Sequence, residues 1–368
     1  MKKILIITNI PSYHQVDLFN KLSENKDVEL LVFYLLKKTV DRHWNNEFTI
    51  LHPHEFIDYK HISQRRGVYY NPSILKKIKE FNPNHLILTQ YANITQQFLL
   101  YYYWLIKKNV NLFFWSEKPG IPHYEVPIIK SRLIREFFRK ISLLPIIKNK
   151  KLKIWGIGNK SVTYFEKITH SKAENFPYYL DIKRFTCTKK RTYEGKIKVL
   201  FAGKFNKRKG FDILLEFLKT SNKKFLENFK FTFIGTGDYE HHLVALKDQF
   251  NYINFEGFVE RQEMPLFYNS NDIFLFPGRY DGWGMVINEG MASGLIMLGS
   301  KNIGAVEDCL IDGVNGFLIQ ENKNSIQDKL LWILNNKKEL EKISINAKQT
   351  SIQNDVFNGY KRFYKLIG

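Results

Sequence analysis

Two acidic residues around a glycine-rich turn are the residues of this sequence best suited to chemistry. Asp281 and Glu289 lie eight positions apart in F-P-G-R-Y-D-G-W-G-M-V-I-N-E-G, where the turn leads into what reads as a helix start. Glycine lets the main chain approach an anion, and the first N–H groups of a helix have no internal partner and lie at its positive dipole end. Because carboxylates accept hydrogen bonds from hydroxyls, the segment could hold a sugar, a ribose and a diphosphate together. The alternative is an ordinary strand–turn–helix whose glycines only ease packing.

A basic segment earlier in the chain could complement those carboxylates. Lys204 and Lys209 lie five positions apart in F-A-G-K-F-N-K-R-K-G, and Gly210 opens a helix. Two cations at a strand end and a helix start suit a diphosphate leaving group, because they stabilise the charge that builds as the sugar departs. A solvated surface turn is the alternative, and we favour it for Lys207 and Arg208.

Composition sets bounds on the class of protein. A chain of 368 residues is long enough for two domains, and 44% hydrophobic with 25% charged residues is ordinary for a folded soluble protein. The two cysteines, Cys187 and Cys309, show no metal or redox spacing, which indicates a reducing compartment. The N-terminal run M-K-K-I-L-I-I-T-N-I reads as a buried strand rather than a signal peptide, and the apolar run 98–106 is too short to cross a bilayer.

The positive charge is unevenly distributed along the chain. Residues 1–190 contain 32 Lys and Arg against 15 Asp and Glu, whereas residues 191–368 contain 24 against 21. Nearly all of the net charge of +20 therefore belongs to the first half. This asymmetry indicates a surface that faces something anionic, either nucleic acid or acidic lipid.

Short β-branched and aromatic runs alternate with helical patterns, which is typical of parallel sheets covered on both faces. In the first half we expect strands near 2–10, 28–36, 85–90, 111–117 and 153–157, and helices near 14–24, 73–81, 94–108, 130–148 and 159–167. In the second half we expect strands near 196–203, 229–235, 253–256, 272–277 and 295–299, and helices near 210–220, 239–249, 262–270, 284–293 and 323–335.

The pattern predicts an α/β protein of two doubly wound, Rossmann-like domains in series. The predicted boundaries are 1–180 for the N-terminal domain, 181–195 for a linker, 196–350 for the C-terminal domain and 351–368 for a terminal helix. Open parallel sheets bind ligands at the carboxyl ends of their strands, so two such domains are expected to face each other across a cleft.

The acidic and basic segments resemble the motifs of family 4 of the retaining glycosyltransferases, which have the GT-B fold. Asp281 and Glu289 match its E-x7-E motif with Asp for the first Glu, and Lys204 and Lys209 match its G-R-x4-K-G motif with Lys for Arg. The resemblance implies that Glu289 binds the ribose hydroxyls, that Asp281 binds hydroxyls of the transferred sugar, and that the lysines bind the diphosphate. The shorter Asp281 leaves the identity of the sugar open.

The same resemblance implies a set of main-chain contacts to a nucleotide sugar. N–H groups of the turn would serve its sugar and phosphates: Gly282, Trp283, Gly284, Met285 and Val286. The Trp283 ring is expected to support the turn by packing, with stacking on substrate as the alternative. A G-x-G beginning at Gly235 would lie on the nucleotide side, and the main chain around Phe258 and Val259 would contact the base.

The first domain matches the family only in outline. His14 follows the first strand and is expected to hold the donor phosphate or position the acceptor; a structural hydrogen bond at a helix start is the alternative. Glu117 follows the fourth predicted strand and is a candidate for orienting the acceptor or handling its proton. His123 is a weaker candidate nearby.

The resemblance also bears on mechanism and cofactors. No carboxylate is placed as a covalent nucleophile of the kind that retaining glycosidases use. Transfer on the donor face, with the departing phosphate accepting the acceptor's proton, is implied instead. The sequence has no D-x-D run beside a strand to hold a metal across a diphosphate, so we expect metal-independent activity and no cofactor beyond the nucleotide sugar.

The segment 130–153 is the most basic of the chain. It contains nine Lys and Arg and one acidic residue, interleaved with Leu, Ile and Phe. A basic amphipathic helix of this kind can lie on an anionic membrane, although packing of its apolar side on its own domain is the alternative. Nucleic acid is not expected as a partner, because no nucleic-acid-binding motif accompanies the charge.

Together these features predict a retaining glycosyltransferase that moves a sugar from a nucleotide diphosphate donor, UDP-sugar favoured, to a saccharide or lipid-linked saccharide acceptor in bacterial-type cell-surface glycan assembly. It is expected in the cytoplasm, with the inner face of the plasma membrane as a peripheral site. The alternatives are a GT-B nucleotide-sugar epimerase and a non-catalytic glycan- or lipid-binding module with a degenerate donor site.

Overall fold

The computed structural model describes residues 1–37, 49–63, 68–91, 93–106, 109–120, 132–187 and 191–368. The chain forms two compact units. Unit 1 comprises Met1–Leu180 with Val356–Gly368, and unit 2 comprises Asp181–Asp355. The stretch predicted as a linker, 181–195, thus falls within unit 2, and most of the predicted terminal helix falls within unit 1.

Unit 1 is built on a parallel seven-stranded sheet of order β3-β2-β1-β6-β7-β8-β9. Its strands are β1 (Lys2–Thr8), β2 (Val28–Tyr34), β3 (His54–Phe56), β6 (His85–Leu88), β7 (Asn111–Ser116), β8 (Lys153–Gly156) and β9 (Ala173–Asn175). Its helices are α1 (Tyr13–Leu22), α2 (Ile74–Phe81), α3 (Ile94–Leu105), α4 (Arg132–Lys148), α5 (Asn159–Thr169) and α14 (Val356–Ile367). A separate two-stranded antiparallel sheet pairs β4 (Lys60–Ser63) with β5 (Val68–Tyr70).

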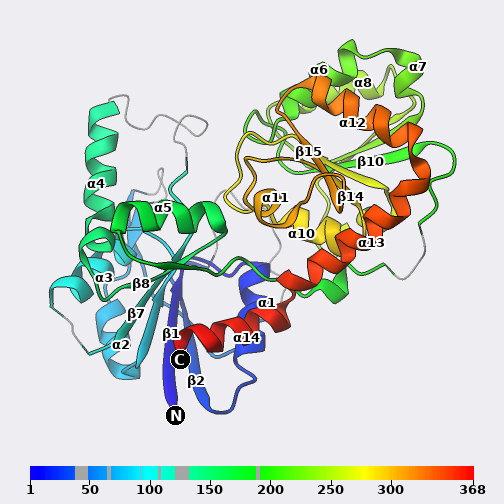
Figure 1. Cartoon of the computed structure of the whole chain (residues 1–368). Coiled ribbons are helices and arrows are strands. Elements are labelled where there is room, and N and C mark those ends of the chain that lie inside the picture. Colours follow the sequence, from blue (N-terminus) through cyan, green and yellow to red (C-terminus); the bar gives the residue numbers. More distant parts are fainter. Residues whose placement is uncertain (38–48, 64–67, 92, 107–108, 121–131, 188–190) are drawn as a thin grey trace. The chain divides into compact units, whose positions relative to one another are not determined.

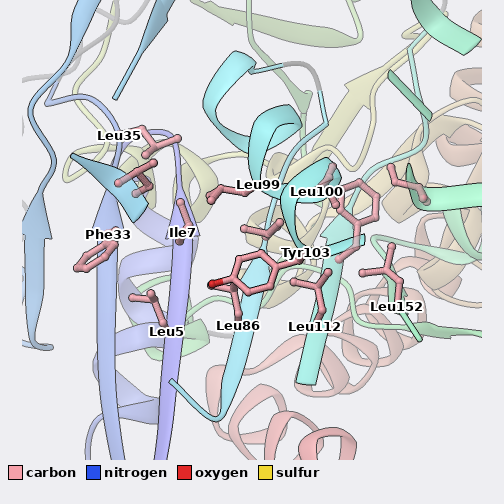
Figure 2. Close-up of a cluster of buried hydrophobic side chains, with 14 of the residues drawn as sticks. Leu5, Ile7, Phe33, Leu35, Leu86, Leu99, Leu100, Tyr103, Leu112 and Leu152 are labelled. Carbon is pink, nitrogen blue, oxygen red and sulfur yellow. The ribbon is translucent and has the colours of Figure 1, made fainter. Parts of the chain in front are cut away.

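Helices cover both faces of this sheet, which explains why its strands are continuous apolar runs rather than alternating ones. On one face, Leu99, Leu100 and Tyr103 of α3 pack on Leu5 of β1 and Leu86 of β6 (Figure 2). The packed side chains are fully or almost fully buried. The sheet is therefore a rigid base for the loops at its carboxyl edge.

The other face of the same sheet is covered by α1 and by the C-terminal helix α14, which contact each other. Phe363 of α14 lies against Trp155 of β8, with ring centroids 5.6 Å apart. The Tyr364 hydroxyl donates to the Leu22 carbonyl at 2.8 Å, and the Val356 N–H donates to the Leu180 carbonyl at 3.0 Å. The last helix of the chain thus completes the core of the unit that contains the first strand.

Unit 2 has a parallel six-stranded sheet of order β12-β11-β10-β13-β14-β15. Its strands are β10 (Ile197–Ala202), β11 (Phe229–Ile234), β12 (Ile253–Gly257), β13 (Ile273–Phe276), β14 (Ile296–Ser300) and β15 (Gly316–Ile319). Its helices are α6 (Phe211–Thr220), α7 (Lys223–Leu226), α8 (Glu240–Lys247), α9 (Met264–Ser270), α10 (Met285–Ala292), α11 (Gly304–Cys309), α12 (Lys323–Asn335) and α13 (Leu340–Ser351). Figure 1 shows α6 and α12 on one face of the sheet and α10 and α13 on the other.

The predicted α/β class of two Rossmann-like domains is confirmed. Eight of the elements described above were not predicted: strands β3, β4, β5, β9 and β15 and helices α7, α11 and α13. The parallel sheets fix which loops can reach ligand, because every strand in a sheet ends at the same edge.

Candidate functional site

In unit 2 most of the candidate residues follow the carboxyl ends of neighbouring strands. Across the sheet these strands run in the order β12, β11, β10, β13. The residues that follow them, in the same order, are Phe258 and Val259, then Gly235, then Lys204 and Lys209, then Asp281 to Gly284. The parallel sheet therefore brings segments up to about 80 residues apart in sequence to one edge, which is where open α/β sheets bind ligands.

Lys209 and Asp281 form an ion pair at this edge. The Lys209 ammonium contacts Oδ2 of Asp281 and lies 4.9 Å from the centre of the Phe276 ring. On the other carboxylate oxygen, Oδ1, Nη1 of Arg208 approaches to 3.8 Å. The three charged side chains are only 14 to 22% exposed, so water screens them less than surface charges. Lys204, in contrast, is exposed.

Arg279 locks the loop after β13 to the loop after β10. Its guanidinium makes a two-pronged contact with Asp212, Nη1 to Oδ1 at 2.6 Å and Nη2 to Oδ2 at 2.9 Å. The same group donates to the Lys207 carbonyl at 2.7 Å, and the Arg279 N–H donates to the Arg208 carbonyl at 2.9 Å. Bidentate guanidinium–carboxylate pairs fix geometry as well as adding energy. The positions of Lys209 and Asp281 are thus set jointly by these two loops.

Glycines at the starts of two helices allow this close approach. Gly210, before α6, has φ +73°, and a Cβ there would collide with the Pro277 carbonyl. Gly284, before α10, has φ +90°, and a Cβ there would lie 2.7 Å from Cγ2 of Ile303. Both residues are in the left-handed region, where other residue types are strained. The predicted glycine turn is therefore required by the backbone path as well as suited to an anion.

The Trp283 ring supports the turn from within. The side chain is 1% exposed, and its indole N–H donates to Oδ1 of Asn288 at 2.8 Å. The Trp283 carbonyl accepts from the Ala305 N–H at 2.7 Å. A ring buried in this way packs against protein, so stacking of a ligand on it would require the turn to open.

Glu289 is nearly buried and held at both oxygens. Tyr268 donates its hydroxyl to Oε2 at 2.7 Å, and Nη2 of Arg261 lies 3.2 Å from Oε1. Burial, and second the charge of Glu289, hold the pKa of Tyr268 well above its ordinary value, so the phenol keeps the proton that it donates. Arg261 also lies over the ring of Phe185, 5.8 Å from its centre. The carboxylate is thus oriented before any ligand binds, and its remaining lone pairs can accept from hydroxyls.

In unit 1, His14 and Glu117 follow β1 and β7, which are separated in the sheet by β6. Nε2 of His14 lies 3.4 Å from the Ser12 hydroxyl, and its ring lies 4.1 Å from that of Tyr178. The Ser116 hydroxyl donates to the Glu117 carbonyl at 3.0 Å, and the Lys118 N–H donates to the Ser161 hydroxyl at 2.9 Å. Both candidates therefore lie at the carboxyl edge of the sheet. His123 lies outside the described residues.

Sequence reasoning missed three side chains of the unit 2 site. Arg208 was predicted as a solvated turn residue but is mostly buried beside Asp281. Arg261 and Tyr268 hold Glu289, and neither was singled out. The sequence does contain a signal for them: a cation and an aromatic hydroxyl follow β12, and a buried glutamate needs hydrogen-bonding partners of that kind.

Among the described residues, no group of three or more His, Cys, Asp or Glu is placed to hold a metal ion, and no helix is long and apolar enough to cross a membrane.

Comparison with known proteins assigns the fold. The Anabaena protein HepE, solved in complex with UDP and glucose, superposes with a TM-score of 0.70 over 100% of this chain and 99% of its own, at 14% identity. WaaG, described as a glycosyltransferase involved in lipopolysaccharide biosynthesis, gives a TM-score of 0.69 over 99% of both chains, at 13% identity. The chain has the GT-B fold. Within it, residues 183–350, nearly the whole of unit 2, match the family of glycosyl transferases group 1.

The proteins that are similar in sequence align with about half of this chain or less. A 41.2 kDa protein from the cps region of Klebsiella pneumoniae is 28% identical over 185 residues, 49% of each chain. A glycosyltransferase of Methanocaldococcus jannaschii is 30% identical over 155 residues, 41% of this chain and 42% of its own. The chain thus spans about half the length of the curated relatives it matches.

Proposed function

We propose that this protein is a glycosyltransferase that moves a sugar from a nucleotide diphosphate donor to a saccharide acceptor. The observation that carries the proposal is the arrangement in unit 2, within the segment that matches glycosyl transferases group 1. There two lysines, a glycine turn at a helix start and an oriented glutamate follow strands that end at the same edge of the sheet. In a nucleotide sugar the lysines would face the diphosphate, the turn would face the sugar and phosphates, and the glutamate would face the ribose.

In this proposal Glu289 accepts hydrogen bonds from the ribose hydroxyls, since Tyr268 and Arg261 already orient it. Lys209 and the exposed Lys204 stabilise the charge that develops on the diphosphate as the sugar departs. The main chain around Gly235, Phe258 and Val259 contacts the nucleotide. These cations supply the positive charge that a metal would otherwise supply, so we propose metal-independent transfer.

We further propose retention of configuration, with the acceptor approaching on the face that the diphosphate leaves. The departing phosphate oxygen takes the proton of the acceptor hydroxyl as the new glycosidic bond forms, so that proton and charge balance. His14 and Glu117 are the residues of unit 1 that we assign to the donor phosphate or the acceptor. A UDP-sugar is the favoured donor, in line with the UDP in the HepE structures.

The proposed acceptor is a saccharide or lipid-linked saccharide of a cell-surface glycan, and the proposed location is the cytoplasm, at the inner face of the membrane. Helix α4 carries exposed Phe137 and Phe138 beside exposed Arg139 and Lys140. Aromatic rings among cations on one helix suit the interface of an anionic bilayer. The side chains of residues 132–136 of this helix are not among those that the structure describes.

The test is a thermal-shift screen against UDP-, GDP-, ADP- and TDP-sugars, followed by a transfer assay with the ligand that binds. A ligand at 100 times its Kd stabilises the folded state by about 2.7 kcal/mol. Glu289→Gln keeps the shape of the side chain but removes the charge that accepts from ribose. We expect it to lose most of the stabilisation and the transfer, whereas the exposed control Glu227→Gln in the same unit should keep both.

Other outcomes would identify the alternatives. Release of a free epimerised sugar without acceptor would indicate an epimerase with the same nucleotide site. Failure of every nucleotide sugar to stabilise the wild type would contradict the proposal and favour a binding module.

A further inference from the structure

The ion pair of Lys209 with Asp281 joins two groups that the proposed donor would also use. Lys209 is the more buried of the two lysines assigned to the diphosphate, with 14% of its side chain exposed. Its ammonium is already engaged by the Asp281 carboxylate on one side and lies over the Phe276 ring. A phosphate that binds Lys209 must therefore approach a cation whose charge is largely balanced within the protein.

Asp281 is held where it stands. Its carbonyl accepts from the Gly304 N–H at 3.2 Å, and its main chain pairs with Ile303. Two positions earlier, Arg279 ties the same loop to Asp212 and to the carbonyls of residues 207 and 208. The carboxylate therefore cannot move far from Lys209 without disturbing the loop, and its short side chain adds little reach.

We propose that Asp281 is an internal counter-ion that competes with the phosphates of a nucleotide for Lys209, so that it weakens binding of the free nucleoside diphosphate more than binding of the sugar nucleotide. This inference rests on the proposed function for the identity of the ligand. Two like charges beside one partly buried cation repel each other, and the repulsion grows with the charge of the ligand. A sugar nucleotide carries two negative charges on its diphosphate, and the free diphosphate gains a third as its terminal phosphate ionises, with a pKa near 6. Asp281 thus promotes dissociation of the nucleoside diphosphate product more than dissociation of the sugar-nucleotide donor.

The experiment measures binding of UDP, UDP-glucose and inorganic pyrophosphate by calorimetry at fixed, low ionic strength. Asp281→Asn keeps the size of the side chain but removes its charge. We expect UDP and pyrophosphate to bind about tenfold more tightly, and UDP-glucose to gain by a smaller factor. Asp328→Asn, at an exposed position of α12, removes the same charge elsewhere in unit 2 and should change none of the three affinities by more than about twofold.

A double-mutant cycle shows whether the competition acts through Lys209. In a Lys209→Met background, Asp281→Asn should improve UDP binding by less than threefold, because the shared cation is gone. Asp281→Glu, which keeps the charge and serves if the Asn variant does not fold, should leave UDP binding within about threefold of wild type. UDP and pyrophosphate binding that stays unchanged or weakens in Asp281→Asn would overturn the inference. A wild type that binds pyrophosphate but no nucleotide would count against the proposed function alone, since the pyrophosphate arm still tests the competition.

Discussion

The hydrogen bond from Tyr268 to Glu289 gives a prediction whose size follows from the structure. Tyr268 is fully buried, and its hydroxyl donates to Oε2 of Glu289 at 2.7 Å. Tyr268→Phe removes the hydroxyl and keeps the ring, which packs edge-on to Phe185 with centroids 5.9 Å apart. A hydrogen bond to a charged group contributes about 1.5–3 kcal/mol. We expect the free energy of unfolding to fall by that amount, measured by denaturant titration.

The same change should weaken nucleotide binding. Without the tyrosine the carboxylate keeps only Arg261 among the partners described above, and ordering one side chain on binding costs about 0.5–1.5 kcal/mol. The expected loss of UDP affinity is therefore about two- to tenfold by calorimetry. Tyr252→Phe is the matched control, because Tyr252 is buried in the same unit and its hydroxyl has no hydrogen-bond partner within the described residues.

Two results would refute this reasoning at different points. Equal stability of the Tyr268 and Tyr252 variants would show that the bond to Glu289 adds nothing to the fold. A less stable Tyr268 variant with unchanged UDP affinity would show that Glu289 is a structural carboxylate, and the ribose assignment would fail.

Two further predictions concern unit 1. Burial, and second the charge of His54, lower the pKa of His52 to about 3. The contribution of neutral His52 to the free energy of unfolding should therefore be fully present above about pH 6.5. It should be lost as the pH decreases toward 3, by about 1.4 kcal/mol per pH unit. Denaturant titrations at pH 7 and pH 5 should show this loss in the wild type and a smaller one in His52→Gln; parallel losses would contradict the assignment. For α4 and its C-terminal end, replacing Arg139, Lys140, Lys148 and Lys151 by Gln should reduce sedimentation with anionic vesicles at least tenfold, at about 1 kcal/mol per basic group. Binding that persists, or that is equal on neutral vesicles, would count against the membrane proposal.

The parts of the fold that were predictable are those that its core dictates. Parallel strands buried on both faces are uninterrupted apolar runs, so β10 and β13 were located to within a residue or two. Helix α13 was missed because its buried face includes Ser344 and Ser351, which hide the helical period. Ser344 is satisfied there by donating to the Gly294 carbonyl at 2.6 Å, a contact across fifty residues that no local pattern reveals.

The site was predictable as a set of segments but not as a set of pairs. Glycines mark the loops at the sheet edge because the backbone path itself requires them, and the cations stand beside them in the sequence. The partner of each charge depends on which strands are neighbours, and Lys209 and Asp281 meet only because β10 adjoins β13. For the same reason Arg208, which reads as a surface residue in its own segment, is mostly buried beside an acid more than seventy positions away.

The two acids of the motif differ in what a ligand must displace. Glu289 is held by Tyr268, a neutral donor at full burial, and by Arg261, and ribose hydroxyls can add to these contacts without competing for either partner. Asp281 is held by Lys209, which a diphosphate would also claim. Changes at Tyr268 should therefore alter stability first and affinity second, because this partner of Glu289 is part of the core. Changes at Asp281 should alter affinity first, because the charge removed there competes with the ligand for Lys209.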